Sequence, residues 1–128
     1  MNALLPEWIA KTEGDYATAQ REMRARQRTN YDAVCFHAQQ MAEKYLKAFL
    51  YGNDVYFPKI HSLIELLQLG LPVDPTLDMQ RELFERLEDY ATKYRYPGTS
   101  ADRDEARIAF RVAGKIRVIM RQKLDLND

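Results

Sequence analysis

The sequence of 128 residues contains a single cysteine and no long hydrophobic run. One cysteine excludes an intramolecular disulfide and is typical of a reducing compartment. No stretch approaches the roughly 20 apolar residues that a membrane-spanning helix needs, and the first residues lack the basic and apolar regions of a secretory signal. We therefore expect a cytoplasmic protein without a transmembrane segment.

Net charge is also absent, since 19 basic side chains balance 19 acidic ones. A neutral chain has no overall field that would concentrate nucleic acid, so such binding would need a local basic patch. The charges are unevenly placed: residues 61–90 hold two basic and seven acidic side chains, and residues 91–128 hold nine basic and five acidic ones. This pattern predicts that an acidic helix attracts a basic one, within the bundle or across a dimer.

Motifs for metal and nucleophilic chemistry are missing too. His37 and His61 do not occur in a metal-ligand spacing, and no glycine-rich loop is present for the phosphates of a nucleoside triphosphate. Cys35 lies beside Val34 on the apolar side of its expected helix, where we expect a small core residue rather than a nucleophile. We therefore predict no metal site and no cofactor.

What the sequence does contain is a succession of amphipathic helical segments. They are expected at residues 6–28, 29–51, 62–70, 74–94 and 99–124. Pro6 suits a first helical turn, and Gly52 and Gly70 suit helix ends. Capping signals open three of the segments: Thr29 with Asp32, Ser62 with Glu65, and Thr99 with Asp102.

No segment has the sustained alternation of a β-strand, apart from short pieces in residues 55–60. Long amphipathic segments joined by short loops predict an all-α protein. We expect an antiparallel up-and-down bundle of about five helices, four long and one short. It should form a single domain over residues 1–128, with its core at about 6–124. The wide apolar helix faces favour a homodimer.

The second segment carries a polar stripe beside its apolar face. His37, Gln40, Lys44 and Lys47 recur at three- and four-residue spacing, and Glu43 precedes Lys47 by four residues. A solvated helix face has this pattern, and so has a ligand-binding face. His61, at the start of the third segment, is open to two interpretations. It either bonds the local backbone or caps the helix, or it points into a cleft shared with the second segment.

Residues 93–97 and the last segment add two further features. Lys93, Tyr94, Arg95 and Tyr96 combine planar donors for phosphate with stacking faces, which suits a nucleotide or single-stranded RNA. A rigid helix end covered by tyrosines would have the same composition. A basic stripe follows at four-residue steps, at Arg103, Arg107, Arg111 and Lys115. It is interpreted as a solvated face or a partner for the acidic segment, with a nucleic-acid surface as the alternative.

The run Gln39-Gln40-x-Ala42-Glu43-Lys44-x-Leu46-Lys47-Ala48 resembles the helix signature of HEPN-domain proteins, the "higher eukaryotes and prokaryotes nucleotide-binding" family. Three further features occur in the order of that family. They are Trp8 followed by Asp15 and Ala19, His61 before Leu66-Leu67, and Arg95-Tyr96-Pro97 after the fourth helix. The resemblance covers about residues 6–124.

The resemblance implies an all-α up-and-down bundle that is commonly homodimeric. In prokaryotes such stand-alone proteins are often encoded beside a minimal nucleotidyltransferase, as a toxin–antitoxin-like pair. It also implies a polar site for a nucleotide or RNA. Carried over position by position, this ligand-binding site comprises Lys44, Lys47, His61, Tyr94 and Arg95.

Many family members are metal-independent ribonucleases with an arginine four to six residues before a histidine. Residues 99–101, which follow Arg95 at that distance, contain no histidine, and neither His37 nor His61 has the preceding arginine. We therefore assign no catalytic residue and expect a binding or interaction module. The alternative is an endoribonuclease in which Arg95 stabilises the phosphate and His61 acts as acid or base.

Overall fold

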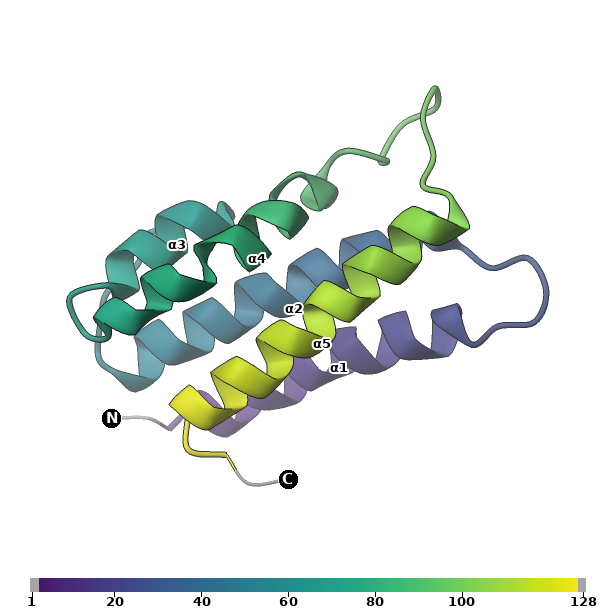
Figure 1. The fold of residues 1–128 in the computed structure, drawn as a ribbon. Helices are drawn as coiled ribbons and strands as arrows, with labels where there is room; N and C mark the ends of the chain where they lie inside the picture. The colour runs from purple at the N-terminus through teal and green to yellow at the C-terminus, as the bar shows by residue number, and fades with distance from the viewer. Residues whose placement is uncertain (1–2, 127–128) are drawn as a thin grey trace.

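The computed structural model describes residues 3–126, and this part of the chain is helical with no β-strand. Three long helices lie side by side (Figure 1): α1 (Leu5–Met23), α2 (Tyr31–Gly52) and α5 (Arg103–Lys123). Two short ones, α3 (Leu63–Gly70) and α4 (Arg81–Leu87), lie between α2 and α5 in the sequence. The predicted all-α helical bundle is confirmed.

The fourth predicted helix is not one long α-helix. It consists of a 3₁₀ turn, η1 (Pro75–Gln80), then α4, then a second 3₁₀ turn, η2 (Glu88–Ala91). Asp74 explains the first of these, because its Oδ1 accepts hydrogen bonds from both N and Oγ1 of Thr76, at 3.0 and 2.5 Å. Such a side-chain turn starts the chain in a tight 3₁₀ conformation. The bundle therefore has three long helices instead of four.

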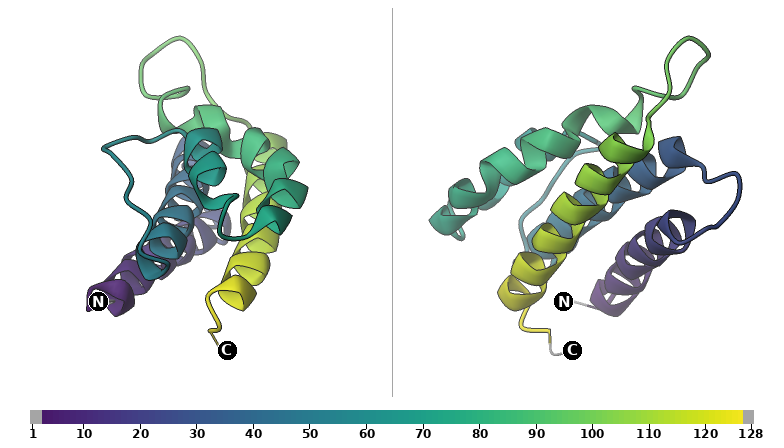
Figure 2. Two further views of the ribbon diagram at one scale, coloured as in Figure 1. Left: turned by 90° about the vertical axis from the view of Figure 1, so that its left-hand side faces the viewer. Right: turned by 45° about the vertical axis from the view of Figure 1, so that its right-hand side comes forward.

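Helix α2 is the centre of the bundle. It packs against α1, α3, α4 and α5, and twelve of its 22 residues are buried, so it is apolar on more than one side. Figure 2 shows α1 on one side of the α2–α5 pair and α3 and α4 on the other. A single hydrophobic core follows α2 from Val34 to Leu50.

Of the predicted capping pairs, Ser62 with Glu65 is confirmed, and for Thr99 with Asp102 the cap of α5 is Asp102 and not Thr99. Ser62 accepts a hydrogen bond from Glu65 N, and Asp102 accepts one from Glu105 N. The prediction for Thr29 is wrong by one residue, because Asn30 caps α2. Asp32 has another role there, since its Oδ1 accepts a hydrogen bond from Ala101 N at 2.6 Å. It thereby ties the start of α2 to loop 92–102.

The ion pairs of α5 agree only in part with the predicted attraction between the acidic segment and the basic one. Lys123 pairs with Asp74 at 2.7 Å, as that prediction requires. Arg117 and Arg121 instead bind Glu13 of α1, and Tyr45 also donates to this carboxylate. Burial opposes ionisation of Glu13, but the hydrogen bonds from Arg117 and Tyr45 outweigh it and lower its pKa. The basic stripe of α5 itself is exposed, which both a solvated face and a nucleic-acid surface require.

Cys35 is completely buried within the core. Burial raises the pKa of its thiol to about 12, so almost no reactive thiolate exists at neutral pH. The interpretation of Cys35 as a small core residue is confirmed.

Candidate functional site

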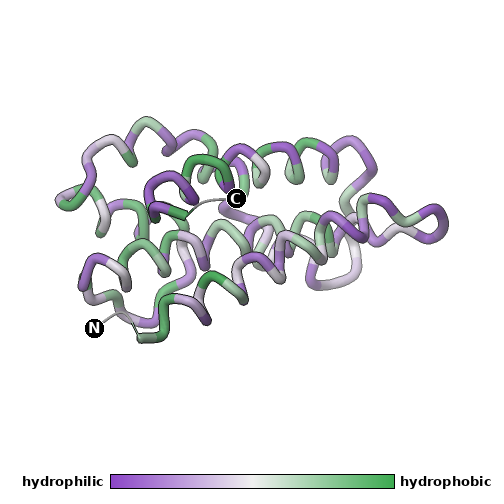
Figure 3. The backbone as a smooth tube through the Cα atoms, turned by 90° about the horizontal axis from the view of Figure 1, so that it is seen from below, coloured by the Kyte–Doolittle hydropathy of each residue, from purple (hydrophilic) through white to green (hydrophobic). Residues whose placement is uncertain are grey.

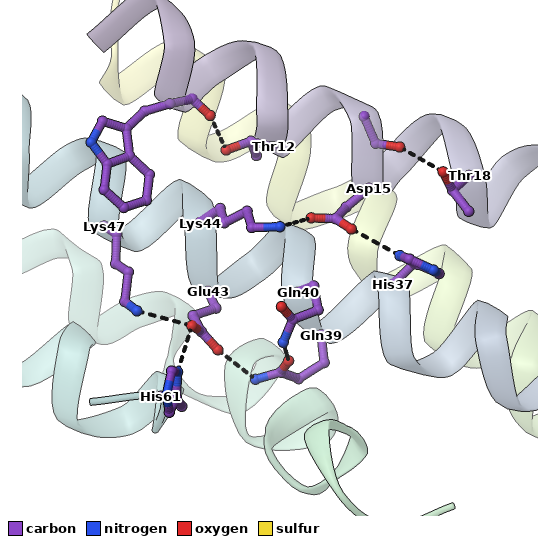
Figure 4. Close-up of polar contacts among 12 residues, drawn as sticks. Thr12, Asp15, Thr18, His37, Gln39, Gln40, Glu43, Lys44, Lys47 and His61 are labelled. Atoms are coloured by element: carbon purple, nitrogen blue, oxygen red, sulfur yellow. Dashed lines mark hydrogen bonds and ion pairs between the residues drawn. The ribbon is translucent and has the colours of Figure 1, made fainter. Parts of the chain in front are cut away.

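Two buried carboxylates organise the polar stripe of α2 (Figure 4). The first is Asp15 of α1, which is only 8% exposed. Its Oδ1 lies 2.8 Å from Nδ1 of His37, and its Oδ2 accepts a hydrogen bond from Lys44 Nζ at 2.5 Å. His37 and Lys44 are two helical turns apart on one face of α2, so a single residue of α1 can contact both. We call these three residues the Asp15 cluster.

The second carboxylate is Glu43 of α2, which is 4% exposed. Its Oε2 lies 3.0 Å from both Lys47 Nζ and His61 Nδ1, and Gln39 Nε2 donates to Oε1 at 3.4 Å. Gln40 in turn donates to Gln39 Oε1 at 2.7 Å. We call these five residues the Glu43 cluster. Ser62 caps α3, so His61 does not have the local capping role that was one of its two interpretations; it contacts α2.

The two clusters orient their histidines in the same way. In each, a buried carboxylate lies within hydrogen-bond distance of Nδ1, so an Nδ1–H group can donate to it, whereas Nε2 is not held by that carboxylate. The side chain of His61 is 69% exposed, whereas that of His37 is 28% exposed. His61 is therefore the histidine that a ligand can reach more easily.

A groove of about 380 Å³ lies at the start of α2, beside η2. We call it the tyrosine groove, and it is lined by Asn30, Asp32, Ala33, Phe36, Tyr90, Ala91, Tyr94 and Arg95. The rings of Tyr90 and Tyr94 are stacked with centroids 6.1 Å apart, and Lys93 Nζ lies 5.7 and 5.2 Å from the two centroids. The groove thus combines aromatic rings with the guanidinium of Arg95, and the ammonium of Lys93 lies over both rings.

Glu105 fixes both tyrosines through their hydroxyl groups. Tyr90 donates to its Oε2 at 2.8 Å, and Tyr94 donates to its Oε1. Burial, together with this carboxylate acceptor, raises the pKa of both phenols, so they remain protonated at neutral pH. Because the hydroxyl groups are already occupied, the rings offer a ligand their faces rather than their polar ends.

The five predicted ligand-binding residues occupy three places. Lys47 and His61 share Glu43, and Lys44 belongs to the Asp15 cluster. Tyr94 and Arg95 line the tyrosine groove. Arg95 is exposed, and among residues 3–126 its guanidinium donates only a long 3.5 Å hydrogen bond, to Ala91 O. The cation of Arg95 is thus more available to a ligand than the paired lysines.

Sequence reasoning missed the carboxylates that hold these residues. The sequence marks Asp15 only as part of a motif, and Glu43 only as a helix-surface partner of Lys47. The contact between Asp15 and His37 joins residues 22 positions apart, and the contact between Glu43 and His61 joins residues 18 positions apart. The burial of these acids and the identity of their partners depend on the fold, so no local pattern in the sequence reveals them.

Two further observations concern residues 3–126. Nowhere in this range do three or more histidine, cysteine or acidic side chains gather in a way that could hold a metal ion. None of its helices has both the length and the apolar character needed to cross a membrane.

The chain is similar to a known protein family and to a solved structure. A family model described as the HEPN domain matches residues 5–123, a range that includes both clusters and the tyrosine groove. The crystal structure of TT1696 from Thermus thermophilus is similar, with a TM-score of 0.79 and 27% sequence identity. The similarity covers 96% of this chain and 99% of that chain. Comparison with curated proteins gives no significant match.

Proposed function

The chain belongs to the HEPN-domain family, and from this premise we propose that it is a nucleotide- or RNA-binding module whose ligand lies in the tyrosine groove. The observation that carries the proposal is the pairing of two stacked tyrosines with Arg95 at the edge of one groove. Aromatic faces accept any nucleobase, and a guanidinium matches the geometry of a phosphate.

The electrostatics of the groove support the same proposal. Lys93 is exposed, and its hydrogen bond with Tyr94 and the charge of Glu105 raise its pKa, so it stays charged. Arg95 has no carboxylate partner among the described residues. A ligand phosphate would therefore find a cation that does not have to break an ion pair first. Asp32 and Glu105, the acids nearby, are already bound by Ala101 N and by the tyrosines.

The biological setting of the proposal rests on the family resemblance. We infer a cytoplasmic homodimer that pairs with a minimal nucleotidyltransferase in a toxin–antitoxin-like system. Exposed apolar side chains on α5, Ile108 and Val118, support a protein-interaction role, because they offer surface that a partner could cover. Lys44, Lys47 and His61 remain predicted ligand residues, and their ion pairs would have to rearrange for direct phosphate binding.

The test is a titration of fluorescent ATP and of a short labelled RNA. Arg95→Ala should weaken binding of both about tenfold, the loss of one charge-assisted contact of about 1.4 kcal/mol. Arg86→Ala is the matched control, since Arg86 is also exposed but lies outside the groove. No binding by the wild type, or equal binding by the wild type and Arg95→Ala, would overturn the ligand assignment.

One observation favours the alternative function, a metal-independent endoribonuclease. The side chain of His61 is exposed and Glu43 contacts its Nδ1, an arrangement that suits a general acid or base. The test is RNA cleavage in the presence of EDTA. Activity that is lost in both His61→Ala and Arg95→Ala would establish the ribonuclease, and the absence of cleavage by the wild type would eliminate it.

A further inference from the structure

A second hollow, of about 260 Å³, lies at the end of the bundle where α1 passes into α2. It is lined by Met23, Ala25, Arg26, Thr29, Tyr31, Arg103 and Arg107, with three arginines and no acidic residue. Figure 1 shows the α1–α2 loop and the start of α5 at this same end, and Figure 3 shows that the loop is strongly hydrophilic. We call it the arginine hollow.

The guanidinium groups of the arginine hollow have almost no acidic partners among the described residues. Within residues 3–126, the side chains of Arg26 and Arg103 make no hydrogen bond or ion pair. Arg107 approaches only Asp104, at 4.0 Å, and the side chain of Asp104 is 83% exposed. Arg117, farther along α5, differs because Glu13 binds it in bidentate fashion. Three like charges around one hollow repel one another, and a bound anion would relieve that repulsion.

The arginine hollow and the tyrosine groove are joined by a shallow connecting surface. Thr29 and Tyr31 line both the arginine hollow and this surface. Asn30 and Asp32 line both the surface and the tyrosine groove. A continuous path therefore leads around the start of α2. The carboxylate of Asp32 lies on this path, and its hydrogen bond from Ala101 N holds loop 92–102 beside it.

We propose that the arginine hollow is a second subsite, which binds the phosphate backbone of a single-stranded nucleic acid whose base lies in the tyrosine groove. The inference rests on the proposed function and sharpens it. A mononucleotide needs only the tyrosine groove, whereas two anion-binding places along one path suit a strand whose phosphates are spread over successive nucleotides. A base can stack on a tyrosine face only when it is free of a duplex, which selects single strands.

The test compares two double variants that remove the same charge. Arg26→Gln with Arg103→Gln should weaken binding of a fluorescein-labelled ten-nucleotide RNA about tenfold. It should also lower the slope of log affinity against log salt by about 1.4, since each phosphate contact on a single strand contributes about 0.7. Binding of fluorescent ATP should not change. The control, Arg111→Gln with Lys115→Gln, alters exposed cations of α5 outside the path and should keep the wild-type slope.

Other outcomes separate this inference from the proposed function. Equal RNA binding by the wild type and the Arg26/Arg103 variant, or an equal loss in the control, would overturn the subsite. So would a wild type that binds ATP but no RNA, and that result would leave the proposed function standing. Unchanged ATP binding in Arg95→Ala would instead overturn the assignment of the tyrosine groove.

Discussion

The Asp15 and Glu43 clusters neutralise their lysines with buried carboxylates, whereas the arginine hollow leaves its arginines largely without acidic partners within residues 3–126. In the clusters, Lys44 and Lys47 each meet a buried carboxylate, and every buried side-chain nitrogen and oxygen among the described residues has a hydrogen-bond partner. In the arginine hollow, Arg26 and Arg103 have no side-chain partner in the described part of the chain. Basic side chains at helical spacing occur in both regions, so that spacing alone does not distinguish them.

The difference separates charges that hold the fold from charges that are available to a ligand. A buried carboxylate destabilises a protein unless it has hydrogen-bond or ion-pair partners. Asp15 and Glu43 therefore depend on their lysines and histidines, and these partners stabilise the fold. An exposed arginine contributes little to stability, so its presence in an acid-free hollow needs another reason. The predictions below test this separation through stability, from the largest effect to the smallest.

The largest effect is expected for Glu43→Ala. This change leaves the ammonium of Lys47, whose side chain is 11% exposed, without its counter-charge and removes the acceptor of His61 and Gln39. We expect a loss of about 3 kcal/mol in the free energy of unfolding, measured by urea denaturation. Glu82→Ala, on the exposed face of α4, should change it by less than about 0.5 kcal/mol. Equal effects of the two would contradict a structural role for the Glu43 cluster.

Asp15→Ala should have a smaller effect, of about 2 kcal/mol in the same measurement. The reason is that the side chains of His37 and Lys44 are 28% and 29% exposed, so water can solvate them once the carboxylate is gone. Asp15→Asn should recover part of the loss, because the amide oxygen can still accept one hydrogen bond. A loss larger than that of Glu43→Ala would reverse the ranking of the two clusters.

A pH-dependent effect is expected at Glu13. Its pKa in the folded protein lies below the ordinary value of 4.5, so its ionised form stabilises the fold above that pH. This contribution should disappear as the pH falls from about 4.5 through the folded pKa. Urea midpoints between about pH 6 and about pH 3 should therefore fall less steeply for Glu13→Gln than for the wild type. Parallel curves would show that Arg117 and Tyr45 do not favour the ionised carboxylate.

The smallest effect on stability is expected for the arginine hollow. Arg26→Gln and Arg103→Gln should each change the free energy of unfolding by less than about 0.5 kcal/mol. Neither side chain has a partner to lose among residues 3–126. A destabilisation comparable with that of Asp15→Ala would place these arginines among the structural charges and remove the contrast between the two regions.

The sequence predicted the features that depend on neighbours in the chain. Ser62 and Asp102 cap their helices because the acceptor and its donor are three residues apart. Cys35 is in the core because the helical period places it on the apolar face. The 3₁₀ turns around α4 were missed, because turn-forming residues at a helix start do not reveal which helix type follows.

The candidate site was predicted only in part, because its contacts join distant segments. The tyrosine–arginine pattern around Arg95 could be read directly, and it lines a groove. The sequence did not predict that the five ligand residues lie in three separate places. Their positions depend on the contact of Asp15 in α1 with α2 and on the contact of His61 with α2. The arginine hollow combines residues of the α1–α2 loop with residues of α5, which no local pattern connects.

The central position of α2 has a consequence for how the molecule unfolds. This helix supplies a residue to each polar cluster, to the hydrophobic core and to the tether from Asp32 to Ala101. No neighbouring helix can therefore detach without exposing part of α2. Its amide protons should exchange with solvent only through global opening, as the most protected of the chain, and the bundle should melt as a single cooperative unit.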